Sequence, residues 1–180
     1  MSHVSAVEMS TVAARRALAC AGLDAKDLDL VIYGGVSNEE LCPNSASGVQ
    51  LSLGATKAAA IDINTACTSF CYGLATATAM IRTGLIRNAV VIGVELISRY
   101  MDWSNRNVAV LFGDGAAAVD AEGEDAGGAA THVLLRQCMA RVVRQARVVD
   151  PLHLRVLAQV ARHGQRVFAD AVHAQGERLD

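Results

Sequence analysis

The run from Asn88 to Val94 constrains the fold of this 180-residue chain most strongly, because every residue after Asn88 is apolar or glycine. Its seven residues suit a strand better than a helix, and a strand that is apolar on both sides must be covered on both faces. Such a strand is typical of the centre of a sheet that is covered on both faces.

Helical and extended patterns alternate along the chain on both sides of this run. Three helices are predicted, over residues 5–21, 45–53 and 68–83. Strands are predicted over residues 28–33, 58–63, 88–94, 108–112 and 116–119, the last two joined by a turn at 113–115. Ser5 and Glu8 fit a capping box at the first helix, and Gly22 fits its end. The alternation predicts an α/β sheet with helices on both faces.

The composition changes toward the carboxyl end. The first 130 residues carry a net charge of −6, whereas the last 50 carry +4, with eight arginines and no lysine. Apolar residues recur at helical spacing over 133–148. We therefore expect a core over residues 1–122 and a divergent, Arg-rich helical tail over 123–180. No aromatic residues alternate with the arginines, so we do not expect nucleic-acid binding.

Several classes of protein are disfavoured. No apolar run approaches the ~20 residues of a membrane helix, and the first residues do not have the build of a signal peptide. The five cysteines have no paired metal-binding spacing, and their odd number argues against a disulfide framework. We therefore expect a cytoplasmic protein with reduced thiols, no membrane partner and no bound metal.

Cys67 is the candidate catalytic residue. It follows a predicted strand that ends near Asn64 and precedes a predicted helix that starts near Thr68. The first amides of a helix lack partners within the helix, and the helix dipole is positive there, so thiolate is favoured over thiol. A thiolate is a covalent nucleophile. The alternative is a small buried core residue. Cys71, one turn later, is interpreted as core packing rather than half of a metal pair.

Several motifs occur in order between residues 61 and 119. They are Asp62-Ile63-Asn64-Thr65-Ala66-Cys67-Thr68-Ser69-Phe70, Tyr72-Gly73-Leu74, Val91-Ile92-Gly93-Val94-Glu95, Asp102-Trp103-Ser104-Asn105-Arg106-Asn107 and Leu111-Phe112-Gly113-Asp114-Gly115-Ala116-Ala117-Ala118-Val119. Together they resemble the β-ketoacyl-acyl-carrier-protein synthase III family, and the resemblance extends back through residues 5–60.

The resemblance implies a thiolase-like, layered α/β/α sandwich, of which this chain holds mainly the first half of a duplicated fold. Residues 1–122 would form the core of that first half, and the tail over 123–180 would partly resemble the start of the second half. It also implies an acyltransferase-type condensing enzyme of fatty-acid synthesis. In that reaction an acyl group passes from acyl-CoA to the cysteine, and the acyl-enzyme condenses with malonyl-acyl carrier protein to give 3-oxoacyl-acyl carrier protein. Acyl-CoA is then a substrate, no cofactor is implied, and a homodimer is expected.

The resemblance assigns roles to other residues as well. Arg106 would contact the CoA nucleotide, since a guanidinium binds phosphate and stacks on adenine; the alternative is a solvated loop residue. Gly164 and Phe168 would line the CoA tunnel. Cys42 would take the place of a residue that lines the partner subunit's acyl pocket, or it is an ordinary loop cysteine.

The family's His-Gln-Ala-Asn motif, which supports decarboxylation, is absent from this sequence, and Val172-His173-Ala174-Gln175 has similar letters in the wrong order. We therefore expect a fragment or truncated member whose condensing activity is incomplete. Two other hypotheses stay open. One is a non-catalytic, truncated thiolase-like chain that dimerises or binds acyl thioesters, and the other is a parent enzyme that loads acyl groups for a polyketide or quinolone pathway.

Overall fold

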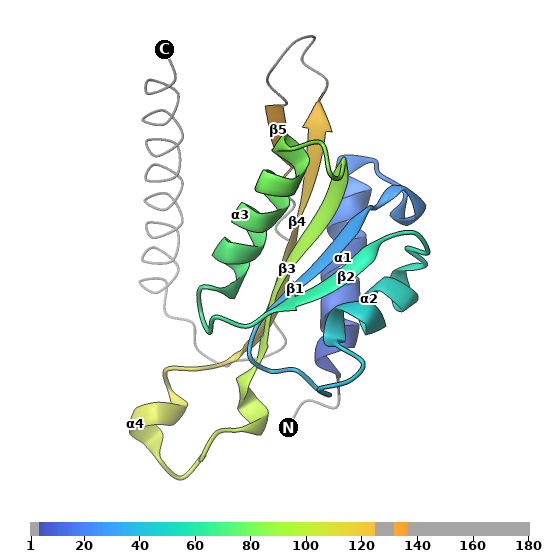
Figure 1. Cartoon of the computed structure of the whole chain (residues 1–180). Helices are drawn as coiled ribbons and strands as arrows, with labels where there is room; N and C mark the ends of the chain where they lie inside the picture. Colours follow the sequence, from blue (N-terminus) through green and yellow to red (C-terminus); the bar gives the residue numbers. More distant parts are fainter. Residues whose placement is uncertain (1–3, 125–131, 137–180) are drawn as a thin grey trace, which may run out of the picture. The chain divides into compact units, whose positions relative to one another are not determined.

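The computed structural model describes residues 4–124 and 132–136. In this part of the chain one mixed sheet has the strand order β2-β1-β3-β4-β5 (Figure 1). The strands are β1 (Leu30–Gly34), β2 (Ala59–Ile63), β3 (Asn88–Leu96), β4 (Asp114–Glu124) and β5 (His132–Arg136). β1 pairs in parallel with both β2 and β3, whereas β4 pairs antiparallel with β3 and β5.

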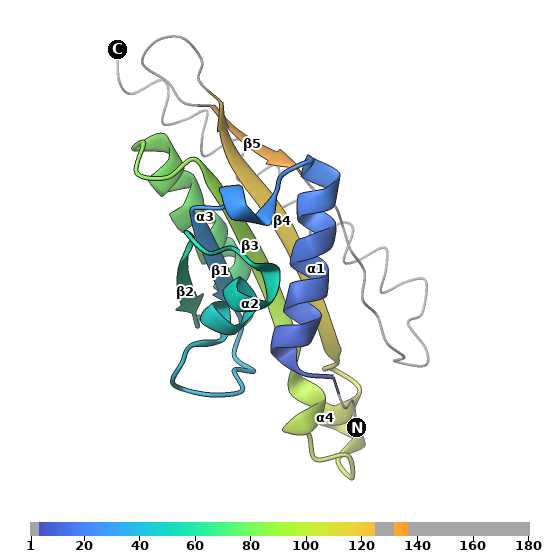
Figure 2. The ribbon, with the colours of Figure 1, turned by 90° about the vertical axis from the view of Figure 1, so that its right-hand side faces the viewer.

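Helices cover both faces of this sheet. The covering helices are α1 (Ala6–Ala21), α2 (Ser45–Leu53) and α3 (Ser69–Arg82). The short α4 (Arg106–Ala109) lies in a loop beyond the end of the sheet (Figure 1), and 3-10 turns occur at Ala25–Asp27 and Ile97–Arg99. α1 and α2 lie on one face and α3 lies on the other (Figures 1 and 2). The predicted α/β class with helices on both faces is therefore confirmed.

The two faces differ in the size of their cores. On one face, small side chains of α1, such as Ala13 and Ala17, pack with Val49 of α2 against Val31 and Ile92 of the sheet. On the other face, Ala77 of α3 belongs to a smaller cluster of buried residues. All five residues of β1 are buried, as are most residues of β3. The interpretation of residues 88–94 as a central strand is confirmed.

The helix ends follow the predicted capping chemistry. The Ser5 hydroxyl accepts a hydrogen bond from the Glu8 amide at 2.9 Å, and Gly22 ends α1 with a φ of 72°. The start of α2 is held differently, since the Asp62 carboxylate of β2 accepts from the amides of Ser45 (2.9 Å) and Ala46 (2.7 Å). A carboxylate at this position also complements the positive end of the helix dipole. It joins α2 to the strand that leads to Cys67.

Two predictions for residues 108–119 are wrong. Residues 108–112 do not form a strand: α4 occupies Arg106–Ala109, and the amides of Val108 and Ala109 both donate to the Asn105 carbonyl. Residues 113–115 are not a turn between two strands, since Asp114 begins β4 and pairs with Leu96 of β3. The strand that pairs with β3 after this loop is β4, and the 108–112 run takes no part in the described sheet.

The carboxyl part also departs from expectation. The predicted helix over 133–148 is wrong at its start, because residues 132–136 form β5, and its remainder lies outside the described residues. The proposed boundary at residue 122 stays a prediction. Cys20 is disulfide-bonded, so the expectation of reduced thiols is wrong for this residue, whereas Cys42, Cys67 and Cys71 are free.

Candidate active site

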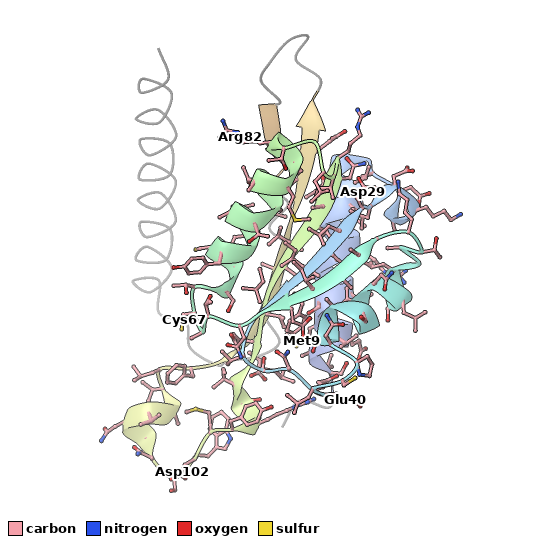
Figure 3. All side chains as sticks on the ribbon, in the orientation of Figure 1. Met9, Asp29, Glu40, Cys67, Arg82 and Asp102 are labelled. Carbon is pink, nitrogen blue, oxygen red and sulfur yellow. The ribbon has the colours of Figure 1, made fainter. Side chains whose placement is uncertain are left out.

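Cys67 lies in the tight turn that links β2 to α3 (Figure 3). β2 ends at Ile63 and α3 begins at Ser69, so the cysteine precedes the first helical residue by two positions. The carboxyl ends of the parallel strands β1, β2 and β3 meet at this edge of the sheet. In open α/β sheets this is the edge at which ligands bind.

Backbone hydrogen bonds close the turn on both sides of the cysteine. The Thr68 amide donates to the carbonyl oxygen of Thr65 (3.3 Å), and the Ser69 amide donates to that of Ala66 (3.0 Å). Neither bond uses the amide N–H of Cys67. Ala66 has a φ of 53°, in the left-handed region that residues with a Cβ rarely adopt. The chain thereby reverses from strand to helix within a few residues.

The sulfur of Cys67 is accessible. Cys67 carries a free thiol, is exposed and lines a cleft of about 400 Å³. The lining residues come from the turn, from the ends of β1 and β3 and from the start of β4: Gly34, Ala66, Cys67, Ser69, Phe70, Gly93, Val94, Glu95, Gly113, Asp114 and Gly115. The alternative interpretation of Cys67 as a buried core residue is therefore wrong.

Glycines let the start of α3 sit directly on the sheet. A Cβ at Gly34 would meet the backbone nitrogen of Phe70 and the carbonyl carbon of Ser69, each at 3.1 Å. A Cβ at Gly93 would meet the Phe70 side chain at 3.3 Å. Both distances are tighter than ordinary contacts. The ends of β1 and β3 therefore form a platform that places the turn carrying Cys67 at the cleft.

The electrostatics of α3 suit an anionic sulfur at its amino end. The helix dipole is positive there, no acidic side chain lies in the first turn, and Arg82 lies in the last turn. Figure 3 shows Arg82 and Cys67 at opposite ends of the helix. The predicted placement of a thiol at the beginning of this helix is confirmed, with the helix starting one residue later than expected.

Two carboxylates, those of Glu95 and Asp114, also line the cleft, and neither was predicted from the sequence as a site residue. Glu95 accepts a hydrogen bond from the Val36 amide through Oε1 (3.0 Å). Asp114 accepts from the amide (2.8 Å) and the hydroxyl (2.6 Å) of Ser98. Both therefore tie strand ends to neighbouring loops. The strand order brings them to the cleft, since β3, which carries Glu95, lies between β1 and β4, which begins at Asp114. That order was not available from the sequence.

The other two free cysteines of the described residues are exposed as well. Cys71 was expected in the core, and this is wrong: its position on α3 faces solvent.

No group of three or more His, Cys, Asp or Glu side chains suitable for a metal occurs within residues 4–124 and 132–136. Cys42 lies in the loop before α2 and precedes Pro43.

The loop that contains Arg106 lies apart from the cleft lining. Arg106 begins α4, is exposed and is not among the residues that line the Cys67 cleft. Nearby, the indole N–H of Trp103 donates to the Ser98 carbonyl (3.3 Å). A hydrogen bond from the Ser104 hydroxyl, together with the Ser104 amide, lowers the pKa of Asp102. These contacts order the loop and leave the Arg106 guanidinium exposed.

Two predicted site residues, Gly164 and Phe168, lie outside the described residues.

No described helix is both long enough and apolar enough to cross a bilayer.

Comparisons with known proteins point to one family. The family model of 3-oxoacyl-[acyl-carrier-protein] synthase III matches residues 61–137, which include Cys67. β-Ketoacyl-[acyl-carrier-protein] synthase III 2 of Vibrio cholerae is 51% identical over 119 residues, which are 66% of this chain and 33% of that protein. β-Ketoacyl-[acyl-carrier-protein] synthase III of Geobacillus kaustophilus is 46% identical over 112 residues, which are 62% of this chain and 36% of that protein.

Solved structures of the same family are also similar to this chain. The chain matches 3-oxoacyl-[acyl-carrier-protein] synthase III of Aquifex aeolicus with a TM-score of 0.64 and 34% identity, over 76% of this chain and 40% of that one. The corresponding enzyme of Pseudomonas aeruginosa gives 0.65 and 35% identity, over 72% of this chain and 40% of that one.

The chain spans about a third of the length of the curated relatives that it matches. The predicted family and fold are confirmed: the chain belongs to the β-ketoacyl-acyl-carrier-protein synthase III family and carries part of its thiolase-like fold.

Proposed function

We propose that Cys67 accepts an acyl group from acyl-CoA and that the chain is part of a condensing enzyme of fatty-acid synthesis. One observation carries this proposal: the free thiol of Cys67 is exposed in a cleft at the amino end of α3. Family membership supports the class of substrate, since relatives of this chain are named for acyl-carrier-protein chemistry.

The chemistry of the first step follows from the turn. The thiolate of Cys67 attacks the thioester carbonyl carbon, and the carbonyl oxygen becomes an oxyanion. The amide N–H of Cys67, which the bonds closing the turn do not use, is a candidate donor to that oxyanion. The tetrahedral intermediate then expels CoA as a thiolate and leaves an acyl-cysteine. This step requires no cofactor.

The second step requires groups that have no counterpart in this sequence. The acyl-enzyme would condense with malonyl-acyl carrier protein, with loss of carbon dioxide, to give 3-oxoacyl-acyl carrier protein. Since the sequence contains no His-Gln-Ala-Asn motif, we propose that this chain alone performs acyl transfer without condensation. Arg106, Gly164 and Phe168 stay proposed CoA contacts, and 1–122 and 123–180 stay proposed divisions of the chain.

Incubation with acetyl-, octanoyl- or decanoyl-CoA, followed by intact-protein mass measurement, tests the acyl transfer. We expect a mass increase of one acyl group, its absence in Cys67→Ser and its retention in Cys71→Ser. Cys71 is the matched control because it is a free, exposed thiol one helical turn away. Equal labelling of the unmodified chain and Cys67→Ser, or no labelling at all, would favour a non-catalytic chain.

We also propose a homodimer in the cytoplasm. Several large apolar side chains of the described part are exposed, among them Leu41, Leu51, Leu85, Val110 and Leu111. Contiguous exposed apolar surface favours association, and Val110, Leu111 and Phe112 are exposed in one consecutive run. Sedimentation velocity should therefore show self-association that increases with concentration. A monodisperse monomer over a hundredfold range of concentration would contradict the dimer and leave the acyl-transfer proposal intact.

A further inference from the structure

We propose that the Ser69 hydroxyl is a positioning group for Cys67, which it holds by fixing the left-handed conformation of Ala66. This inference deepens the proposed function, since a nucleophile must keep a fixed orientation relative to the helix and the cleft. It assigns to Ser69 no contact with substrate.

The hydroxyl of Ser69 joins the two residues that precede Cys67. It donates to the carbonyl oxygen of Ala66 (2.6 Å) and accepts from the amide of Thr65 (2.9 Å). Ser69 is only 2% exposed, so water does not readily replace either bond. One buried side chain thus satisfies a donor and an acceptor of the turn at the same time.

Ala66 needs such support. Its φ of 53° lies in the left-handed region, which is sterically unfavourable for an L-residue with a Cβ. Its carbonyl oxygen accepts two hydrogen bonds from Ser69, one from the amide (3.0 Å) and one from the hydroxyl. The peptide between Ala66 and Cys67 contains this carbonyl. Its orientation therefore also fixes the direction of the Cys67 amide N–H.

The hydroxyl of Ser69 does not serve as an ordinary helix cap. Ser69 is the first helical residue, and the N-cap residue Thr68 makes no side-chain capping bond to the helix. The Thr68 hydroxyl instead donates to the Thr65 carbonyl (2.7 Å). Both hydroxyls at the start of α3 are therefore directed back to the turn, and only that of Ser69 reaches Ala66.

A double-mutant cycle tests this role through iodoacetamide alkylation, in which the sulfur displaces iodide and no acyl transfer is required. The rates at Cys67 and Cys71 are measured in the same molecules by peptide mass, so that Cys71 is the internal reference. We expect Ser69→Ala to lower the Cys67-to-Cys71 rate ratio about fivefold when residue 66 is alanine. In the Ala66→Gly background the same substitution should lower the ratio less than twofold, because glycine adopts positive φ without strain.

An unchanged ratio, or an equal loss in both backgrounds, would overturn the proposal. If Ser69→Ala alone does not fold, the double variant decides: a folded double variant whose ratio lies within twofold of that of Ala66→Gly supports the proposal, and an unfolded one overturns it. Failure of acyl transfer from CoA would leave these rates measurable, so the two proposals fail separately.

Discussion

The two ends of the parallel strands are built from different interactions. At the carboxyl ends, glycines bring backbone against backbone, and the turn carries an exposed thiol and a left-handed alanine. At the amino ends, Asp29 accepts hydrogen bonds from the amides of Arg87 (2.8 Å) and Asn88 (3.1 Å), and its carboxylate lies 3.3 Å from the Lys57 ammonium. Figure 3 shows Asp29 and Cys67 at opposite ends of the sheet.

The two ends therefore have different roles: the amino end contributes mainly to stability, and the carboxyl end carries the candidate active site. The amino end pairs its polar groups with one another, so its charge serves to hold β1 and β3 together. The carboxyl end leaves a nucleophile exposed and accepts strain beside it, which natural proteins concentrate at functional sites. Substitutions at the two ends should therefore change the free energy of unfolding by different amounts and with different pH dependence.

The largest effect on stability is expected at the carboxyl end, from Gly35→Ala. A Cβ at Gly35 would lie 2.1 Å from the Val94 carbonyl oxygen, so the backbone of β1 or β3 must shift. We expect a loss of about 3 kcal/mol in the free energy of unfolding, measured by urea titration. Gly113→Ala is the control, because its Cβ would meet nothing within 4 Å. Equal stabilities for the two variants would show that the carboxyl end is not tightly packed.

A smaller effect is expected at the amino end, from Asp29→Asn. Burial raises the pKa of Asp29, but bonds from the Arg87 and Asn88 amides and the nearby Lys57 outweigh it, so the pKa lies below its usual value of 3.8. The ionised carboxylate therefore stabilises the fold above about pH 4, and this contribution disappears as the pH falls through the folded-state pKa. We expect a loss of about 1 kcal/mol at pH 7, since the side chain is partly exposed.

Urea titrations of both proteins between pH 7 and pH 2.5 test this expectation. The difference in unfolding free energy between the unmodified chain and Asp29→Asn should shrink toward zero at the acid end. A difference that stays constant with pH would mean that the charge of Asp29 contributes nothing.

The smallest effect is expected from Lys57→Met. The Lys57 side chain is 53% exposed, and ion pairs at such positions contribute little. We expect a loss of about 0.5 kcal/mol or less at low ionic strength, which salt abolishes. A loss as large as that of Asp29→Asn would show that the ion pair, rather than the backbone amides, holds the amino end.

The sequence was sufficient to predict the helices whose ends carry local capping signals. Ser5, Glu8 and Gly22 act through contacts within a few residues of each other, so their pattern is readable from the chain alone. The position of Cys67 between a strand and a helix was readable for the same reason. The family resemblance then supplied the type of chemistry.

The sequence was not sufficient to predict features that depend on contacts between distant segments of the chain. Residues 108–112 have the composition of a strand, yet Val110 and Leu111 are 77% and 71% exposed, because β4 already occupies the edge of β3. Glu95 reaches the cleft only because β3 lies beside β1. Ser69 has the appearance of a helix-start residue, and its bonds to the turn depend on the conformation of Ala66.

The most direct test of the account is the distribution of acyl groups among the three free, exposed thiols of the described chain. The unmodified protein is mixed with octanoyl-CoA, quenched at intervals, digested and analysed by peptide mass for Cys42, Cys67 and Cys71. We predict that Cys67 is acylated at least tenfold faster than either of the other two, because it alone lies in the cleft at the start of a helix. Equal rates at all three thiols, or faster acylation of Cys71, would contradict the central claim.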